Sequence, residues 1–223
     1  MLLEESLWFK NTIHKYITQS SLVLNIGSSS KHFIEVEQPY IKKNLIDELI
    51  AKQCTIKNID IRFEEGVDIV GDVTNTNFIR QIKNLSPDVI ICSNLLEHLE
   101  DRTAFCAGLS QMMGESTLLI VSVPYKFPYH EDPIDTLFRP NLIDLQKTFN
   151  SLKFVDGRIV DCGTYHSYSS RHLKFSAKII DFLRISRGLF RAYFINKERF
   201  NNLLWYYKKI SASCAIFRVE KNL

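Results

Sequence analysis

The sequence lacks any long hydrophobic run. Its apolar stretches stay well short of the ~18 residues that a membrane-spanning helix needs, although 45% of the 223 residues are hydrophobic. Near the amino end, Glu4 and Glu5 stand where a secretory signal peptide would carry positive charge. We therefore expect a cytoplasmic protein that is neither exported nor inserted into a membrane.

Cysteine pairs and zinc-type histidine spacing are also missing. The five cysteines form no CxxC pair and stand among apolar residues, which indicates free thiols in a reducing compartment: Cys54, Cys92, Cys106, Cys162 and Cys214. The histidines are not spaced as zinc ligands are. His130 with Glu131 and Asp132 could form a metal site, but we expect no metal there.

A strong excess of one charge is absent from the chain as a whole. The formal net charge of +3 gives no reason to expect a nucleic-acid partner. Basic residues do cluster at 171–209. This segment contains ten Lys or Arg residues, interleaved with aromatic residues, and its only acidic residues are Asp181 and Glu198. Such a basic amphipathic segment could lie on the inner face of an anionic membrane or bind an acidic substrate. It could equally be a lid helix that packs on the sheet or on a second subunit of a homodimer.

Short apolar runs alternate with helical patterns along the rest of the chain. The runs predict strands at 21–26, 55–61, 66–73, 88–94, 116–124, 157–165 and 212–221. Helices are expected at 2–18, 44–53, 75–84, 95–113, 141–151 and 171–209. This alternation predicts one α/β domain over 1–223 with a doubly wound, mostly parallel sheet whose core spans 21–165.

Polar residues follow each of the first four predicted strands. In an open parallel sheet, ligands bind outside the carboxyl ends of the strands. Gly27 would let the backbone approach a ligand closely, Asp60 could accept from ribose hydroxyls, and Asp72 could accept from an adenine amino group. Each could also be an ordinary turn or cap residue. Their recurrence at four strand ends favours a site for an adenosine-containing ligand.

These segments together resemble a known family. The runs LVLNIGSSS, NIDI, VDIVGDVTN, PDVIICSNLLEHLED and VSVPYKFPYHEDPIDTLFRP look like the class I S-adenosylmethionine-dependent methyltransferases. They are closest to the small type 11-like enzymes of glycan and cell-surface biosynthesis. The resemblance implies a Rossmann-like seven-stranded sheet with an antiparallel last strand, S-adenosylmethionine as cofactor, and a small, glycan or lipid-linked acceptor.

The resemblance also implies roles for individual residues. Gly27 and Ser28 would lie against the methionine and ribose end of the cofactor, in a turn that also includes Asn25. The other cofactor-binding residues would be Asp60 and Ile61 at the ribose, Asp72 and Val73 at the adenine, and Ser93 and Asn94 beneath the sulfonium. The family usually has an acidic residue in place of Asn25 and further glycines in place of Ser29 or Ser30.

The loop after the fifth strand carries the candidates for acceptor chemistry. Methyl transfer to oxygen needs alignment, a dry pocket and a base, and an imidazole near neutral pH can serve as that base. His130 is the first candidate, and Glu97 with His98 is the second. The predicted acceptor-binding residues are Tyr129, Asp132, Asp135 and Arg139. Alternatively, His130, Asp135 and Arg139 only fix the loop, and Glu97 and His98 only cap a helix.

Two other functions share this fold class. A nicotinamide oxidoreductase would need a glycine-rich fingerprint, and the GSSS turn lacks the second and third glycines. A binding module that has lost catalysis is the alternative that we carry forward, because Asn25 and the serine-filled turn depart from the family pattern. Asp60, Asp72 and the His130 loop argue against it.

Overall fold

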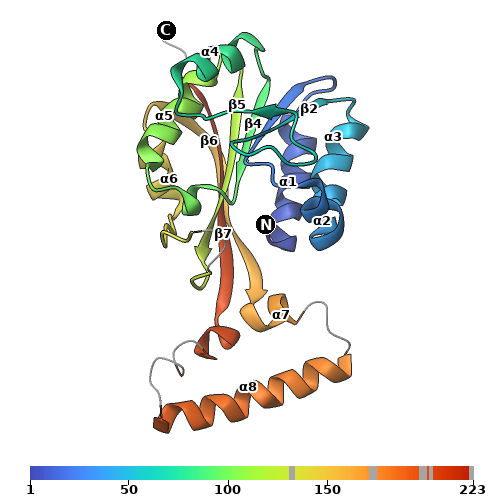
Figure 1. Ribbon diagram of the computed structural model, residues 1–223, viewed down its shortest axis with the longest axis vertical. Coiled ribbons are helices and arrows are strands. Elements are labelled where there is room, and N and C mark those ends of the chain that lie inside the picture. The colour runs from blue at the N-terminus through green and yellow to red at the C-terminus, as the bar shows by residue number, and fades with distance from the viewer. Residues whose placement is uncertain (131–133, 171–174, 196–199, 201–202, 221–223) are drawn as a thin grey trace.

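The computed structural model of the chain describes residues 1–130, 134–170, 175–195, 200 and 203–220. These residues form a seven-stranded sheet in the order β3-β2-β1-β4-β5-β7-β6 (Figure 1). The strands are β1 (Leu22–Ile26), β2 (Thr55–Asp60), β3 (Ile69–Val70), β4 (Val89–Ser93), β5 (Leu118–Lys126), β6 (Leu152–Thr164) and β7 (Lys209–Val219).

The sheet is mostly parallel. β1 pairs in parallel with β2 and β4, β2 with β3, and β4 with β5. β7 is antiparallel to both β5 and β6. The predicted α/β fold class, with its antiparallel last strand, is therefore confirmed.

Helices cover both faces of the sheet. One face carries α1 (Leu3–Tyr16), α3 (Asp47–Ala51) and the short helical segments η1 (Phe33–Glu37), α2 (Pro39–Ile41) and η2 (Lys42–Ile46) (Figure 1). The other face carries α4 (Thr76–Asn84), α5 (Arg102–Met112) and α6 (Leu142–Thr148).

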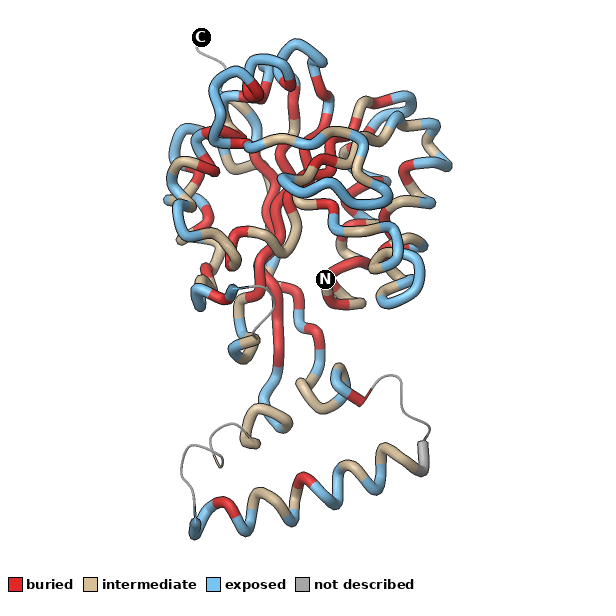
Figure 2. The backbone as a smooth tube through the Cα atoms, viewed as in Figure 1, coloured by how far each residue is buried: buried red, intermediate tan, exposed pale blue. Residues whose placement is uncertain are grey.

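The apolar core is divided by the sheet into two layers. Side chains alternate along a strand, so Ile90 packs in one layer with α4 and α5, whereas Ile91 packs in the other with Phe9 and Ile13 of α1. Both isoleucines are fully buried. Because the strands are covered on both sides, they are continuous apolar runs in the sequence, and Figure 2 shows them as the buried centre of the molecule.

Side-chain caps set where several helices begin. The Asn75 side chain accepts hydrogen bonds from the backbone of Asn77 and Phe78 at the start of α4. Asp101 accepts from the Ala104 N–H group and starts α5. The helix expected at 95–113 is therefore interrupted: a 3₁₀ turn, η3 (Leu96–His98), precedes α5, and Leu99 is extended between them.

Four other predicted boundaries are wrong. The strand expected at 66–73 is reduced to β3, and the one expected at 157–165 begins earlier, at Leu152, because it pairs with β7 from Val219 onward. The basic segment 171–209 is not one helix. Its described part consists of α8 (Phe175–Ile195) and the 3₁₀ turn η4 (Trp205–Tyr207), and β7 then starts at Lys209 rather than at residue 212.

The ends of β6 and β7 run beyond the rest of the sheet as a two-stranded extension, which leads to α7 (Tyr165–Ser169) and η4 (Figure 1). α8 lies at this end of the molecule, the end toward which the carboxyl ends of β5 and the strands parallel to it point. Its ring contacts join Phe182 to His166 of α7 and to Tyr207, and Ser186 is hydrogen-bonded to the Tyr207 hydroxyl at 2.7 Å. α8 is therefore attached through α7 and η4.

Candidate functional site

The carboxyl ends of three parallel strands bring the predicted cofactor residues into one row. Ile26 at the end of β1 is in register with Ile59 of β2 and Cys92 of β4. The next residue along each strand is therefore Gly27, Asp60 or Ser93, and these three lie side by side. This arrangement depends on long-range strand pairing, which the local sequence pattern only implied.

The turn after β1 has the backbone that a close ligand approach requires. Gly27 has a φ of +71°, and a Cβ atom there would lie 2.7 Å from Leu95 Cδ2. The N–H groups of Gly27 and Ser28 both donate to the Ile59 carbonyl, at 2.8 and 3.4 Å. Ser29 also adopts a positive φ, of 61°. The turn thus bends sharply at Gly27 while it stays tied to β2.

Asn25 has a partner within the sheet. It is buried, and its Nδ2 atom donates to Asn58 Oδ1 on β2 at 3.0 Å. Ser28 is buried as well. The amide of Asn25 therefore links β1 to β2 at the level just below the turn.

The two aspartates differ in their surroundings. Asp60 is half-buried, and its Oδ1 atom accepts from the Arg62 N–H group at 3.1 Å, whereas the neighbouring Ile61 is exposed. Asp72 is exposed, and its Oδ1 atom accepts from both the N–H and the hydroxyl of Thr74 at 2.8 Å. Val73 is buried against Gly108 of α5, where any side chain would collide with the Val73 carbonyl. Asp72 thus makes the hydrogen bonds expected if it is an ordinary turn residue.

Two polar side chains, those of Asn94 and of Ser122 on β5, lie next to each other where β4 ends. The backbone N–H of Asn94 donates to the Ser122 carbonyl at 2.9 Å. The Asn94 Oδ1 and Ser122 Oγ atoms are buried and have no hydrogen-bond partner among the described residues. Because buried polar atoms are rarely left unpaired, this is where a bound group would satisfy them.

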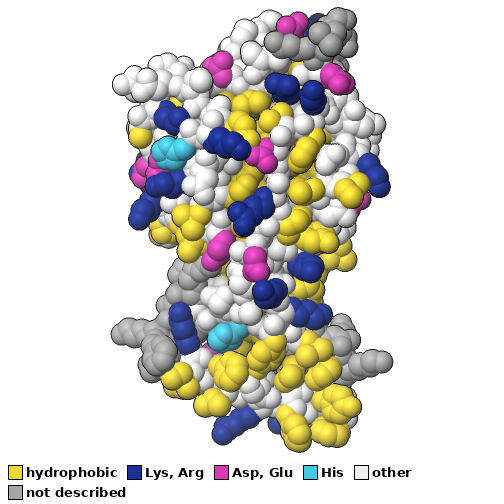
Figure 3. Space-filling model, turned by 180° about the vertical axis from the view of Figure 1, so that it is seen from behind, with side chains coloured by type: hydrophobic (Ala, Val, Ile, Leu, Met, Phe, Trp, Pro, Cys, Tyr) yellow, Lys and Arg dark blue, Asp and Glu magenta, His cyan; other side chains and the backbone are white. Residues whose placement is uncertain are grey.

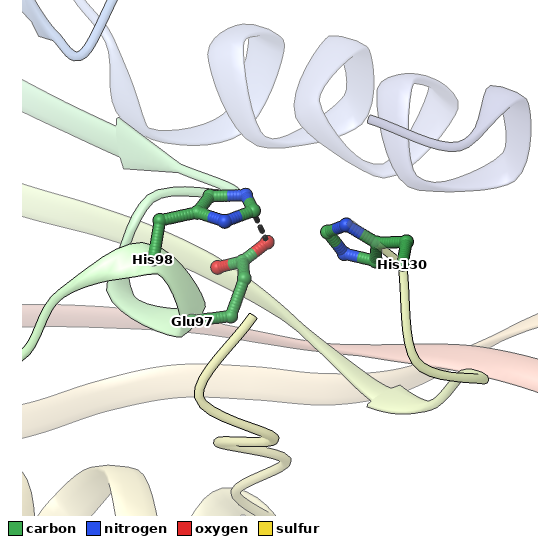
Figure 4. Close-up of side chains that lie close together, drawn as sticks. All are labelled: Glu97, His98 and His130. Carbon is green, nitrogen blue, oxygen red and sulfur yellow. Dashed lines mark ion pairs between the residues drawn. The ribbon is translucent and has the colours of Figure 1, made fainter. Parts of the chain in front are cut away.

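The acceptor candidates Glu97, His98 and His130 come together although 32 positions separate the last two (Figure 4). Glu97 and His98 lie on η3, and His130 lies on the loop after β5. One ligand-type atom from each side chain lies within 4.8 Å of the others. Glu97 Oε1 is 3.8 Å from His98 Nε2, and the two imidazole ring centres are 5.2 Å apart.

The electrostatics of this cluster follow from burial. The Glu97 side chain is 1% exposed, and its removal from water raises its pKa to about 8. The nearby negative charge of Glu5 adds to this effect. His98 Nδ1 lies 2.5 Å from the Ile134 carbonyl oxygen. A carbonyl only accepts, so Nδ1 carries the proton and Nε2 faces Glu97.

The loop after β5 is held by an ion pair. Arg139 donates to both Asp135 oxygens, at 3.0 and 2.5 Å, and to the carbonyls of Phe127 and Pro128. Asp135 also accepts from the N–H groups of Leu137 and His130, at 2.8 and 3.1 Å. Although burial opposes ionisation, the Arg139 guanidinium and these N–H groups hold the Asp135 pKa at about 2. The contacts of Asp135 and Arg139 are therefore those expected if the two residues fix the loop.

Of the remaining residues predicted to act on the acceptor, two are described by the structure and one is not. Tyr129 is exposed beside His130. His130 itself is partly exposed, with its ring against Phe127 and its Nε2 atom 3.9 Å from Asp135 Oδ2. Asp132 lies outside the described residues, so its predicted role is untested.

Glu5 was not among the predicted site residues. It is fully buried on α1, its Oε2 atom accepts from the Leu2 N–H group at 2.9 Å, and its Oε1 atom has no hydrogen-bond partner among the described residues. A charged residue in the first turn of a helix normally looks like a solvated helix end. Only the contact between α1 and the sheet places it near Glu97.

Sequence comparison gives no family. No protein-family model matches the sequence, and neither does any curated protein. Comparison of structures does give a clear result. Coclaurine N-methyltransferase bound to N-methylheliamine and SAH superposes with a TM-score of 0.53 at 13% identity, covering 96% of this chain and 71% of that one.

Two further structures are similar. A proposed methyltransferase from Bacillus halodurans has a TM-score of 0.57 at 9% identity, covering 96% of this chain and 99% of the other. The [4+2]-cyclase SpnF has a TM-score of 0.50 at 10% identity, covering 96% and 82%. At these identities the likeness concerns the fold. The chain has the fold of class I S-adenosylmethionine-dependent methyltransferases.

Proposed function

We propose that this protein is an S-adenosylmethionine-dependent methyltransferase that acts on a hydroxyl oxygen of a small or glycan-type acceptor. The observation that carries the proposal is the row of Gly27, Asp60 and Ser93 at the carboxyl ends of neighbouring strands. It supplies a close-approach turn, a carboxylate and a polar strand end where this class of sheet binds its ligand.

The residues at this edge fit the cofactor. The turn at Gly27 has no room for a side chain beside Leu95, and Asn94 Oδ1, which has no hydrogen-bond partner among the described residues, lies at the neighbouring strand end. In this proposal Asp60 and Ile61 hold the ribose, Asp72 and Val73 the adenine, and Asn25, Gly27, Ser28, Ser93 and Asn94 the methionine end. When bound, the cofactor supplies an electrophilic methyl group.

His130 is the proposed base. It would take the proton from the acceptor hydroxyl, while Asp135 and Arg139 position the loop that carries it. Glu97 and His98 form the alternative pair, because they lie within reach of the same point. Tyr129 and Asp132 would contact the acceptor beside His130.

A lipid-linked acceptor at an anionic membrane surface would fit the surface of α8. Its outward face carries Ile179, Leu183, Phe190 and Phe194, each about half or more exposed, at spacings of four and seven residues. Arg184, Arg187 and Arg191 are exposed alongside, and Figure 3 shows hydrophobic and basic side chains gathered at this end. None of the described helices is long and apolar enough to span a bilayer, so contact would be with the surface alone.

The alternative is a methyltransferase-fold protein with another use. The cyclase among the similar structures illustrates that the fold by itself does not fix the reaction. A binding module would take up the cofactor without turnover.

Calorimetric titration of the full chain with S-adenosylmethionine and S-adenosylhomocysteine tests the proposal. We expect binding that Asp60→Ala weakens at least tenfold, with Asp47→Ala, an exposed aspartate on α3, as the matched control. The absence of binding by folded wild-type protein would refute the proposed function. Binding without methyl transfer to any hydroxyl acceptor in a glycan screen would favour the binding module.

A further inference from the structure

A cluster of two imidazoles and one carboxylate lies at the acceptor end of the candidate site. Among the described residues, Glu97, His98 and His130 form a group whose ligand-type atoms all lie within 4.8 Å of one another. Glu97 and His98 come from η3, and His130 comes from the opposite loop (Figure 4). The group is thus formed by tertiary contact, which explains why histidine spacing in the sequence did not predict it.

The orientation of His98 is that of a metal ligand. Its Nδ1 proton is donated to the Ile134 carbonyl at 2.5 Å. This bond leaves a lone pair on Nε2, which points toward Glu97 Oε1 at 3.8 Å. Metal-binding histidines usually donate their other ring N–H to a carbonyl or carboxylate in this way.

Glu97 provides a second, independent observation. Its side chain is 1% exposed, and its Oε2 atom is buried without a hydrogen-bond partner among the described residues. Glu97 Oε1 and His98 Nε2 therefore face each other across a gap too long for a hydrogen bond. A cation between them would bind the carboxylate form of Glu97 and the lone pair of His98 Nε2, and any proton on Glu97 would be released to solvent on binding.

We propose that Glu97, His98 and His130 bind a first-row divalent cation of the Zn²⁺ type. Imidazole and carboxylate ligands together suit such ions, and a three-ligand set leaves positions open for an oxygen-containing molecule. Binding of the cation stands on these residues alone. Only its role, which is to hold the acceptor oxygen, rests on the proposed methyltransferase function.

The distances indicate which ligand moves. Metal–ligand bonds of about 2.0 to 2.2 Å place ligand atoms roughly 3 to 3.5 Å apart, so the cluster closes slightly on binding. The His98 and Glu97 side chains are 15% and 1% exposed, whereas that of His130 is 29% exposed on a loop. His130 would therefore be the ligand that moves toward the cation. Because a metal bond uses the same lone pair as a general base, cation binding through His130 would replace its proposed role as the base, and the bound cation would polarise the acceptor hydroxyl instead.

Titration of metal-free full-length protein with Co²⁺ tests the proposal, with visible absorption and calorimetry as readouts. We expect one Co²⁺ ion per chain with ligand-field bands, displaced by Zn²⁺. Glu97→Gln and His130→Ala should each weaken binding at least tenfold. His14→Ala is the matched control, because His14 Nε2 also faces a carboxylate, Glu48, at 2.9 Å, but on the surface. It should bind as the wild type does.

The outcomes are separable. If Glu97→Gln does not fold by circular dichroism, His130→Ala, on the exposed loop, decides the question. Wild-type protein that takes up no Co²⁺, or variants that bind it unchanged, would overturn the metal site. S-adenosylmethionine titrated into the same samples keeps the two proposals distinct: cofactor binding without Co²⁺ binding rejects only the metal, and Co²⁺ binding without cofactor binding rejects only the methyltransferase.

Discussion

Asp135 and Arg139 show how one ion pair can position a reactive loop. The Asp135 side chain is 0% exposed and that of Arg139 is 13% exposed, so the charges are compensated mainly by each other and by backbone groups. The backbone N–H of His130 is bonded to the same carboxylate. A substitution at Asp135 should therefore change the position of His130, although His130 itself is not substituted.

The first prediction concerns this carboxylate. Asp135→Asn leaves the mostly buried Arg139 guanidinium without its anion, which should lower the free energy of unfolding by about 3 kcal/mol. Urea unfolding measures the change. Asp47→Asn removes the exposed partner of Lys42 and should cost less than about 1 kcal/mol. Equal losses in the two variants would contradict a special role for the Asp135 pair.

The second prediction concerns Gly27. Alanine there would have to adopt a φ of +71° and push Leu95 aside, so Gly27→Ala should lose about 1 to 2 kcal/mol of stability. It should also weaken S-adenosylmethionine binding, because the strained turn and the displaced Leu95 side chain would change the surface at the end of β1. Gly114→Ala is the matched control, since the nearest atom to a Cβ there is Thr117 Oγ1 at 3.6 Å. Cofactor affinity that is unchanged in Gly27→Ala would argue against this turn as the binding surface.

At the scale of elements, buried strands were the most predictable part of the chain. β1, β4 and β5 lie within the predicted runs or extend them slightly, because strands covered on both faces must be apolar throughout. The break between η3 and α5 was not predicted. The apolar spacing of residues 95–113 is helical, but the Asp101 cap and the bonds from Arg102 to the Leu96 and Leu99 carbonyls impose a turn. The periodicity of the apolar residues does not show that the cap and these hydrogen bonds outweigh a continuous helix.

The candidate site was only partly predictable, for the same reason. Strand ends appear in the sequence, so Gly27, Asp60 and Ser93 could be named. The burial of Glu5 and Glu97 and the approach of His98 to His130 depend on contacts between distant segments. No spacing rule contains those contacts.

The third prediction concerns the link between α1 and α3. Hydrogen bonding to Lys10, opposed by burial and assisted by His14, lowers the Glu48 pKa below its ordinary value of 4.5. A depressed folded-state pKa stabilises the protein above the unfolded-state value, and this stability is lost as the pH falls through the folded-state value. The stability difference between wild type and Glu48→Gln should therefore be about 0.5 to 1 kcal/mol at pH 7 and should shrink below about pH 4.5. Urea unfolding at neutral and acidic pH measures it, and a difference that grows on acidification would contradict the assignment.

At the scale of the whole molecule, the α8 end differs from the rest. The sheet and its helices bury their apolar residues in two layers, whereas α8 leaves large apolar side chains in contact with solvent. A hollow of about 430 Å³ on this helix is lined by Leu189, Phe190, Tyr193, Phe194, Phe200 and Ser186. Covering this surface would remove its apolar side chains from water, which is energetically favourable.

The fourth prediction is that anionic lipid covers it. Vesicles containing phosphatidylserine should co-sediment the full chain, and neutral phosphatidylcholine vesicles should not, because Arg184, Arg187 and Arg191 add electrostatic attraction to the apolar contact. Phe190→Ser with Phe194→Ser should abolish sedimentation, and Arg187→Glu with Arg191→Glu should weaken it in a salt-dependent way. Phe63→Ser is the control, since Phe63 is 84% exposed at a distance from α8 in the sequence and in another part of the fold. Light scattering on the same samples tests the competing partner: a stable dimer that Phe190→Ser dissociates, with no vesicle binding, would assign the α8 surface to a second copy of the chain.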